Sequence, residues 1–191
     1  MSRYLQWSRR EHRSSTRTAV ILLLGPVFLG LLPALVAAAG PRLDRKLGRQ
    51  PIRAGSAGRL LGWSMAVAGF SLGVWSVEAQ VDRGRGTPLP VMPTQELLTD
   101  GPFRHCRNPM TLGAILAYLG IAITAGTTAG IGVVLASGAF LVAYLKRVEE
   151  PELAERFGEP YLTYKRTTPF IVPRLLPRAH RAWGSVFEMG G

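Results

Sequence analysis

The residues of this chain that are best suited to chemistry lie in the turn Gly101–Gly113, GPFRHCRNPMTLG, and in the adjacent carboxylates Glu149 and Glu150. Residues 108–145 form a span of 38 residues without an Asp, Glu, Lys, Arg or His. Because about 20 apolar residues cross a bilayer, this span predicts two membrane helices. A hairpin of two helices returns both glutamates to the membrane face that carries Arg107. Carboxylates at the edge of hydrocarbon are costly without a partner, so the pair predicts a site for a small cation.

Two further uncharged stretches predict the helices that accompany this hairpin. Ala19–Gly40 has 22 residues and Leu60–Val77 has 18. The first is longer than the apolar core of a signal peptide, and no small-residue cleavage site follows it, so we interpret it as a retained helix. The sequence therefore predicts an all-α polytopic membrane protein with about four transmembrane helices, a C-terminal helical hairpin and a cytoplasmic amphipathic helix.

The predicted helices divide the chain into segments without dividing it into domains. At 191 residues there is room for one domain, so we predict a single integral membrane domain over residues 1–191. A basic arm is predicted at residues 1–18 and two N-terminal membrane helices within residues 19–77. The catalytic region is predicted at residues 78–177, and a loose tail at residues 178–191.

The basic residues give a net charge of +11 and flank the predicted membrane helices. They accompany no nucleic-acid-binding motif, so lipid headgroups are the expected partner and nucleic acid is not. With a cytoplasmic N-terminus, the cytoplasmic segments carry 17 Lys and Arg residues and the outer segments six, all within residues 41–59. Lys and Arg favour the cytoplasmic side. We therefore predict a protein of the cell or inner membrane, with the active site and both termini facing the cytoplasm.

Local signals predict where several elements begin and end. Asn108 is suited to the N-cap and Pro109 to the first residue of the third membrane helix. Small residues on both arms of the hairpin are expected to let them approach closely: Gly113, Ala117 and Gly120, then Gly130, Ala136 and Gly138. The Gly- and Arg-rich segment Asp44–Gly58 is predicted to be irregular. Three prolines predict a loop within Val81–Asp100.

An amphipathic helix is predicted to begin at Pro151. Leu153, Phe157 and Tyr161 follow each other at four-residue intervals and give this helix one apolar face. The acidic residues of the same segment are expected to point elsewhere, toward solvent: Glu152, Glu155 and Glu159. The single cysteine, Cys106, excludes an intramolecular disulfide and a cysteine-based metal site. We interpret it as a packed thiol and expect no metal.

The turn, the uncharged hairpin, the glutamate pair and the segment RFGEPYLTYKRTTPFIVPR occur in an order that resembles one family. They are similar to the isoprenylcysteine carboxyl methyltransferase and phospholipid methyltransferase superfamily of integral membrane enzymes. The resemblance covers roughly residues 84–177. It implies a methyltransferase that uses S-adenosylmethionine, bound near the cytoplasmic face, and that acts on a lipophilic small-molecule, lipid or prenylated acceptor.

The resemblance also implies roles for individual residues. It implies catalytic roles for Arg107, Glu149 and Glu150. Contacts to the cofactor fall on the turn and the same glutamates: Gly101, Arg104, Asn108, Pro109, Thr111, Glu149 and Glu150. Contacts to the acceptor fall on Tyr161, Tyr164 and Arg174. The residue types suit the cofactor, because carboxylates attract its sulfonium and ammonium groups, while an arginine and a helix N-terminus attract its carboxylate.

The turn departs from the common pattern of the family, which is Arg-His-Pro-x-Tyr. This chain has Asn108 in place of the histidine and Thr111 in place of the tyrosine. Asparagine cannot titrate, so no obvious base is present, and an acceptor that is already nucleophilic at neutral pH is favoured. The preferred function is therefore an isoprenylcysteine carboxyl O-methyltransferase-like activity.

Several alternatives stay open at this point. A phosphatidylethanolamine-type N-methyltransferase is one, and a small hydrophobic acid or thiol is a further candidate acceptor. A catalytically silent membrane scaffold of the same fold is another. Glu149 and Glu150 are then only a solvated helix end, paired with Lys146 or Arg147.

Overall fold

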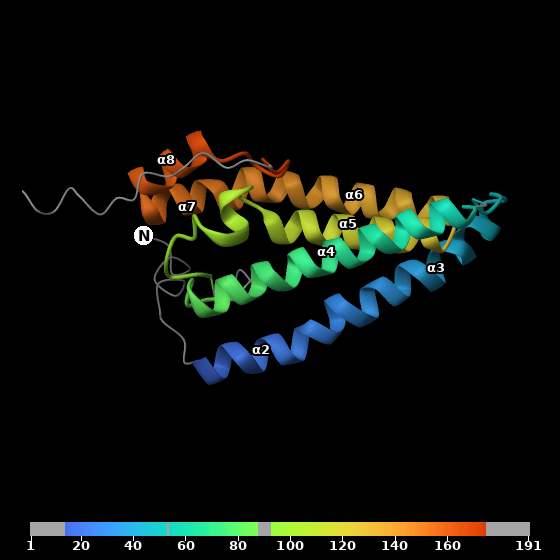
Figure 1. The fold of residues 1–191 in the computed structure, drawn as a ribbon, viewed down its shortest axis with the longest axis horizontal. Coiled ribbons are helices and arrows are strands. Elements are labelled where there is room, and N and C mark those ends of the chain that lie inside the picture. The colour runs from blue at the N-terminus through green and yellow to red at the C-terminus, as the bar shows by residue number, and fades with distance from the viewer. Residues whose placement is uncertain (1–13, 53, 88–92, 175–191) are drawn as a thin grey trace, which may run out of the picture.

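The computed structural model describes residues 14–52, 54–87 and 93–174, and all regular structure in these ranges is helical. Figure 1 shows the arrangement of the helices. In chain order the elements are α2 (Ser14–Pro26), the π-helix η1 (Val27–Leu31), α3 (Leu32–Lys46), α4 (Ser56–Asp82), the 3-10 helix η2 (Gly101–Arg104), α5 (Pro109–Thr124), α6 (Thr128–Tyr144), the π-helix η3 (Leu145–Glu149), α7 (Glu150–Phe157) and α8 (Glu159–Thr167).

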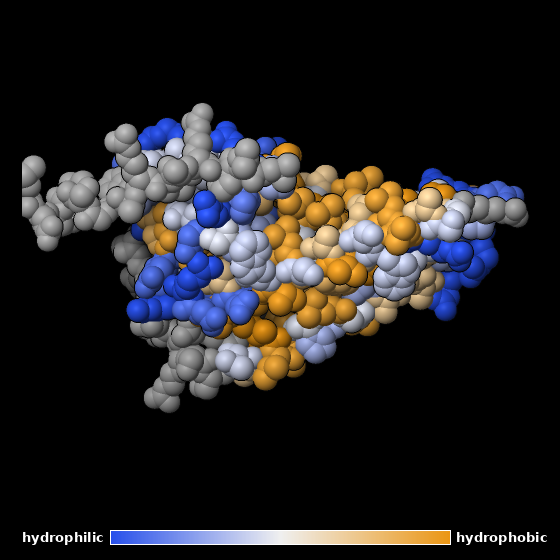
Figure 2. Space-filling model, in the orientation of Figure 1, coloured by the Kyte–Doolittle hydropathy of each residue, from blue (hydrophilic) through white to orange (hydrophobic). Residues whose placement is uncertain are grey.

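Three helical segments of the described chain are long and apolar enough to cross a membrane: Thr18–Lys46, Ser56–Asp82 and Thr128–Phe157. A fourth apolar helix, α5, has 16 residues, which corresponds to about 24 Å of helix. Figure 2 shows a broad hydrophobic band between two hydrophilic ends. The prediction of an all-α polytopic membrane protein with a C-terminal helical hairpin is confirmed.

The helices turn back on one another, so the polar connections gather at two ends of the molecule (Figure 1). The C-terminal end of α4, the beginning of α5 and the helices α7 and α8 lie at one end, which we call the site end. The opposite end, called the far end, holds the connection between α3 and α4 and the turn between α5 and α6. The predicted meeting of the Arg107 turn with the glutamates is thereby confirmed.

Helices α4 and α5 pack so closely that glycine is required at their contact. A Cβ atom added at Gly69 would lie 2.4 Å from the backbone nitrogen of Ala117 and 2.5 Å from the carbonyl oxygen of Gly113. One added at Gly120 would lie 2.4 Å from the carbonyl oxygen of Gly62. The small residues of α5 therefore face α4. The expectation that they serve the contact between the two arms of the hairpin was wrong for these residues of α5, whereas Gly138 of α6 does lie against Ile115 of α5.

The first membrane segment contains a π-helical turn whose free carbonyl is satisfied by another helix. The amide of Leu32 bonds to the carbonyl of Val27, five residues earlier. In the same five-residue pattern, the carbonyl of Phe28 would accept from the amide of residue 33. That residue is Pro33, which has no N–H. The hydroxyl of Tyr118 on α5 donates to this carbonyl at 2.8 Å. A buried or lipid-facing carbonyl without a donor is costly, so this bond ties the π-helical turn to α5.

At the far end, a buried carboxylate holds α3 against the beginning of α6. Asp44 is 2% exposed and accepts three hydrogen bonds, from the hydroxyls of Thr127 and Thr128 at 2.6 and 2.7 Å and from the amide of Ala129 at 2.8 Å. Because helix α3 continues through Pro41 as far as Lys46, the prediction of an irregular segment from Asp44 was wrong at its beginning. Among described residues, the irregular connection is confined to 47–52 and 54–55.

The segment after Glu150 forms two short helices, whereas one amphipathic helix was predicted. Gly158 separates α7 from α8 and adopts φ +61°, a conformation that favours glycine. Glu152 is only partly exposed, and it forms an ion pair with Arg156. The expectation that it faces solvent was therefore wrong, whereas Glu155 is exposed as expected.

Some sequence-based predictions concern residues that lie outside the described ranges. They are most of the basic arm, the centre of the proline-rich loop and the C-terminal tail, at residues 1–13, 88–92 and 175–191. The predicted cytoplasmic location of both termini also concerns these residues and stays a prediction.

The contact between α4 and α5 generates a prediction about stability. Gly69→Ala should lower the thermal unfolding temperature in detergent, because its methyl group meets backbone atoms and overpacking costs about 1–3 kcal/mol. Gly73→Ala, one turn along the same helix, is the matched control, since a Cβ there has no atom within 4 Å. Similar unfolding temperatures for the two variants would contradict the proposed role of this contact.

Candidate functional site

A cavity of about 250 Å³ lies at the site end, where α4, α5, α6, α7 and α8 converge. Its polar lining includes Arg107, Asn108, Glu149, Glu150 and Tyr161. The remaining wall is largely apolar, with contributions from the loop after α4 and from α5 and α6: Leu97, Leu98, Phe103, Met110, Leu141 and Leu145. The cavity therefore combines a charged end with an apolar wall close to the membrane band.

Glu150 is the centre of a compact group of charges. Its Oε1 lies 2.6 Å from Nη1 of Arg107, and its Oε2 lies 2.8 Å from Nζ of Lys165. The side chains of Arg107 and Glu150 are about 10% and 9% exposed, so this ion pair is largely buried. Removing one partner of such a pair leaves an uncompensated buried charge, which typically costs about 3–5 kcal/mol.

The guanidinium of Arg107 keeps unused hydrogen-bonding capacity despite this ion pair. Its Nε and Nη1 are buried and donate to no acceptor in the described part of the chain. Nη1 is close to the carboxylate of Glu150 but is not aligned for a hydrogen bond. Buried donors without acceptors are costly, and these belong to a residue that lines the cavity. A ligand with an anionic group would satisfy them.

Glu149 differs from its neighbour in forming no ion pair with a described residue; the positive charge of Arg156 acts on it only through space. It lines the same cavity and is partly buried, yet its carboxylate forms no ion pair or hydrogen bond with any described residue. The two glutamates therefore do not act as one pair: Glu150 is neutralised by two cations, and Glu149 is available to a cationic ligand. The alternative of a solvated helix end paired with Lys146 or Arg147 was wrong for Glu150, which is 7% exposed and pairs with Arg107 and Lys165.

The turn that carries Arg107 is held by the chain segment after α8. The amide of Arg107 donates to the carbonyl of Pro169 at 2.9 Å, and the amide and side-chain Nδ2 of Asn108 both donate to the carbonyl of Phe170. The ring of Phe170 also lies 5.5 Å from Cζ of Arg107 and 4.9 Å from Nζ of Lys146. This segment therefore fixes both the backbone and the guanidinium of Arg107.

The turn ends at the beginning of α5, as predicted, with Asn108 at the N-cap position and Pro109 as the first helical residue. The side chain of Asn108 does not cap the helix, because it binds Phe170. The amides of Met110 and Thr111 accordingly form no hydrogen bond within the described chain, and both residues line the cavity. A helix N-terminus with free amides favours an anionic group.

Tyr161 and Tyr164 are buried beside the charged group, at 2% and 4% exposure. The hydroxyl of Tyr164 donates to the carbonyl of Phe103 at 2.7 Å and so connects α8 to the turn. Burial raises the pKa of Tyr161 to about 12, with the charge of Glu150 adding to the shift. Burial also raises the pKa of Tyr164. Both phenols are therefore protonated at neutral pH and can donate hydrogen bonds but cannot accept a proton.

Cys106 is confirmed as a packed thiol. It is 1% exposed, and burial raises its pKa, so the nucleophilic thiolate is disfavoured.

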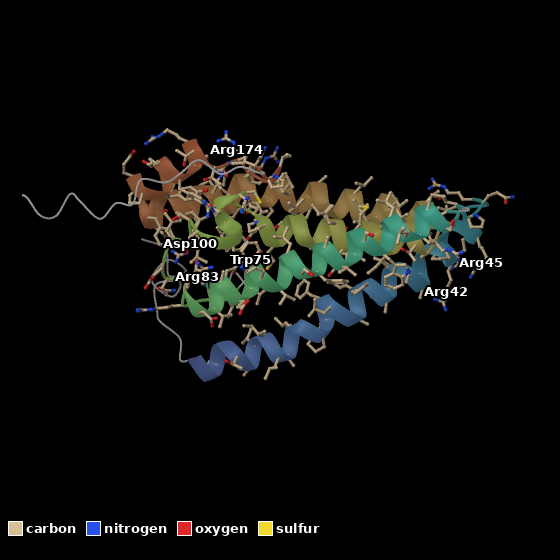
Figure 3. The ribbon with its side chains drawn as sticks, in the orientation of Figure 1. Arg42, Arg45, Trp75, Arg83, Asp100 and Arg174 are labelled. Atoms are coloured by element: carbon tan, nitrogen blue, oxygen red, sulfur yellow. The ribbon has the colours of Figure 1, made fainter. Side chains whose placement is uncertain are left out.

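Three residues that the sequence assigned to the site do not line the cavity. Arg104 and Arg174 are exposed, and Figure 3 shows Arg174 at the edge of the molecule. The amide of Arg174 donates to the carbonyl of His105, and Nδ1 of His105 lies 2.9 Å from the carbonyl oxygen of Arg174. Gly101 adopts φ +54° and lies against the guanidinium of Arg83. These residues shape the turn and attach it to the following segment.

Several residues of the cavity were not predicted from the sequence. Gln80 reaches it from α4, and Glu152 and Arg156 reach it from α7. Arg156 also donates to the carbonyl of Thr94 at 2.6 Å, which attaches the loop after α4 to the cavity wall. Only the four-residue interval between Glu152 and Arg156 was a usable sequence signal, because the other contacts join segments far apart in the chain.

The arrangement suits a ligand that carries both charges. Arg107 and the amides of Met110 and Thr111 offer donors to an anionic group, and Glu149 offers a carboxylate to a cationic one. The apolar wall accommodates a hydrophobic second group. No histidine or lysine is among the described residues that line the cavity.

Comparison with known proteins assigns the chain to a family. The sequence profile of the phospholipid methyltransferase family matches residues 57–160, which include α4, α5, α6, α7 and the Arg107 turn. No solved structure matches the chain.

Two curated proteins share part of the sequence. The cobalt-zinc-cadmium resistance protein CzcN of Cupriavidus metallidurans is 33% identical over 88 residues, or 46% of this chain and 40% of that protein. Methanethiol S-methyltransferase 2 of Bradyrhizobium diazoefficiens is 30% identical over 122 residues, or 62% of this chain and 45% of that protein. The chain thus spans less than half the length of either relative. The profile match covers more than half of the chain, and this protein belongs to the phospholipid methyltransferase family.

Proposed function

We propose that this protein is an S-adenosylmethionine-dependent methyltransferase that acts on a lipophilic acceptor at the membrane surface. The observation that carries the proposal is that one cavity holds both buried Arg107 donors without an acceptor and a Glu149 carboxylate that is in no ion pair. Family membership supports the same reaction class.

The residues of the cavity fit the charged groups of S-adenosylmethionine. Glu149 would hold its ammonium or sulfonium group, and Arg107 with the amides of Met110 and Thr111 would hold its carboxylate. Glu150 positions Arg107 and is itself held by Lys165. When bound, this cofactor supplies an electrophilic methyl group on sulfur. The protein contributes by orienting the donor and excluding water from its charged end, which accelerates a displacement between two bound reactants.

The cavity wall favours an acceptor that is already nucleophilic at neutral pH. An ammonium acceptor must lose a proton first, and the described lining offers no histidine or lysine to receive it, only glutamates, of which Glu149 is assigned to the donor and Glu150 is held by two cations. Tyr161 cannot serve, since its pKa of about 12 keeps the phenol protonated. The apolar side chains of Leu97, Met110 and Leu141 suit a hydrophobic acceptor, and Leu141 is also exposed on the membrane-facing side. These features favour an isoprenylcysteine-type carboxylate.

A thiol is the second candidate acceptor. The relative from Bradyrhizobium diazoefficiens is a methanethiol S-methyltransferase, and a thiolate is a ready nucleophile. The phosphatidylethanolamine-type amine remains an alternative because of the family name; the described cavity offers it only carboxylates as bases, and of these we assign Glu149 to the donor.

The first prediction concerns activity. Incubation of the purified protein with methyl-labelled S-adenosylmethionine and host membrane extract should transfer label to a lipophilic acid or thiol, identified by mass spectrometry. Calorimetry in detergent provides the control for binding of the donor and of its demethylated product. Absence of both binding and transfer at millimolar donor would leave the silent scaffold as the correct description.

The second prediction separates the residues that contact the donor from their neighbours. Glu149→Gln should weaken donor binding at least tenfold, which corresponds to about 1.4 kcal/mol, because it removes the unpaired carboxylate. Glu155→Gln is the matched control, since this residue lies on α7 but is exposed and away from the cavity. It should change the affinity less than about threefold, or roughly 0.6 kcal/mol.

The demethylated product, which lacks the sulfonium charge, distinguishes the group that Glu149 recognises. Equal losses of affinity for donor and product in Glu149→Gln would identify the ammonium, and a loss for the donor alone would identify the sulfonium. A loss of donor affinity no larger than that of Glu155→Gln would contradict the assignment of Glu149 to the donor.

The third prediction concerns orientation, for which we propose that the site end faces the cytoplasm. The test uses two single-cysteine variants, Asp100→Cys and Ser56→Cys, each in a Cys106→Ser background. The two positions lie at opposite ends of the molecule. In intact cells an impermeant thiol reagent should label the cysteine at position 56 and leave the one at position 100 unlabelled. The reverse pattern would place the cavity on the outer face.

A further inference from the structure

The far end of the molecule carries a concentrated positive charge that no ion pair with a described residue neutralises. Five cationic residues at or beside the connection between α3 and α4 are exposed: Arg42, Arg45 and Lys46 of α3, Arg49 of the connection and Arg59 of α4. Figure 3 shows Arg42 and Arg45 at the end of α3. None of the five forms an ion pair with another described residue. We call these five residues the far-end cluster.

In the described part of the chain, the far end has one acidic side chain, and this offsets the five cations only in part, through its attraction to Arg49. Its single carboxylate, Asp44, is buried and is saturated by hydrogen bonds from Thr127, Thr128 and the amide of Ala129. These bonds also fix the rotation of α3 about its axis. Because Asp44 points inward, Arg42 and Arg45 are left on the outer surface of the helix.

Apolar side chains place the cluster at the depth of lipid headgroups. Exposed hydrophobic residues adjoin it in sequence, with exposures of 40–69%: Leu43, Leu47, Ile52, Leu60 and Leu61. Figure 2 shows this hydrophilic end directly adjoining the hydrophobic band. Arg and Lys side chains at such a boundary extend their charged ends toward the phosphate layer while their stems lie along apolar surface.

We propose that the far-end cluster binds the phosphate groups of anionic phospholipids in the adjacent leaflet. Lys and Arg residues close to an anionic membrane surface are attracted to it, and arginine binds phosphate oxygens with two parallel hydrogen bonds. The neighbouring leucines favour a lipid over a soluble acidic partner, because they require hydrocarbon beside the charges. This interaction is independent of the methyltransferase site, which lies at the other end of the helices.

The test uses the full chain reconstituted in nanodiscs of equal parts phosphatidylglycerol and phosphatidylcholine. Native mass spectrometry then measures which lipids stay bound. The wild type should retain phosphatidylglycerol in preference to phosphatidylcholine, and the preference should weaken with salt, which screens exposed charges. The triple variant Arg42→Gln, Arg45→Gln and Arg49→Gln should reduce the preference roughly tenfold.

Two controls separate charge from structure. The triple variant with lysine at the same three positions keeps the charges and should keep the preference. Arg147→Gln removes an exposed cation of the membrane segment near the site end and should have little effect. If the triple glutamine variant does not fold, Arg45→Gln alone should give an intermediate loss. A wild type without preference for phosphatidylglycerol, or glutamine variants that retain it, would overturn the proposal and point to a soluble acidic partner.

Discussion

The close backbone contact between α4 and α5 is the constraint on which the rest of the structure depends. Glycines at positions 62, 69, 113 and 120 let the two helices approach to a distance that a methyl group would prevent. Within a membrane, association of helices relies on packing of this kind, because lipid is as apolar as the helix surface. The contact fixes where α5 begins relative to the end of α4. It therefore sets the position of the Arg107 turn and of one wall of the cavity.

On this scaffold, the buried ion pair between Arg107 and Glu150 gives the site its polarity. Lys165 and the segment around Phe170 hold the pair from outside the membrane helices. Two adjacent residues of the same helical segment thus differ: Glu150 pairs with cations of the protein, whereas Glu149 forms no ion pair with a described residue and is the one we propose to hold a cation of the ligand. Replacing either Arg107 or Glu150 would leave the other charge buried without its partner, so the site and the local fold are energetically linked.

Part of the candidate site was predictable from sequence because its signals are local. The uncharged span, the Asn108–Pro109 helix start and the glutamates that follow the span require only the length of a membrane helix and the chemistry of helix ends. The cavity residues Gln80 and Arg156 were missed, since their positions depend on contacts with distant segments. Arg104 and Arg174 were assigned to the cavity but lie outside it, because sequence proximity to a motif does not fix the direction of a side chain.

The sequence by itself determined the class of the protein, the membrane hairpin and the meeting of the Arg107 turn with the glutamates, since hydrophobic length and charge distribution follow directly from residue types. Tertiary structure alone decided which helix the glycines of α5 contact and which of the two glutamates is paired. It also decided that Asp44, in a connection expected to be irregular, is buried and saturated by hydrogen bonds. The physical reason is the same in each case: burial and partner choice depend on which distant segments pack together, and residue type sets only the cost of leaving a group unpaired.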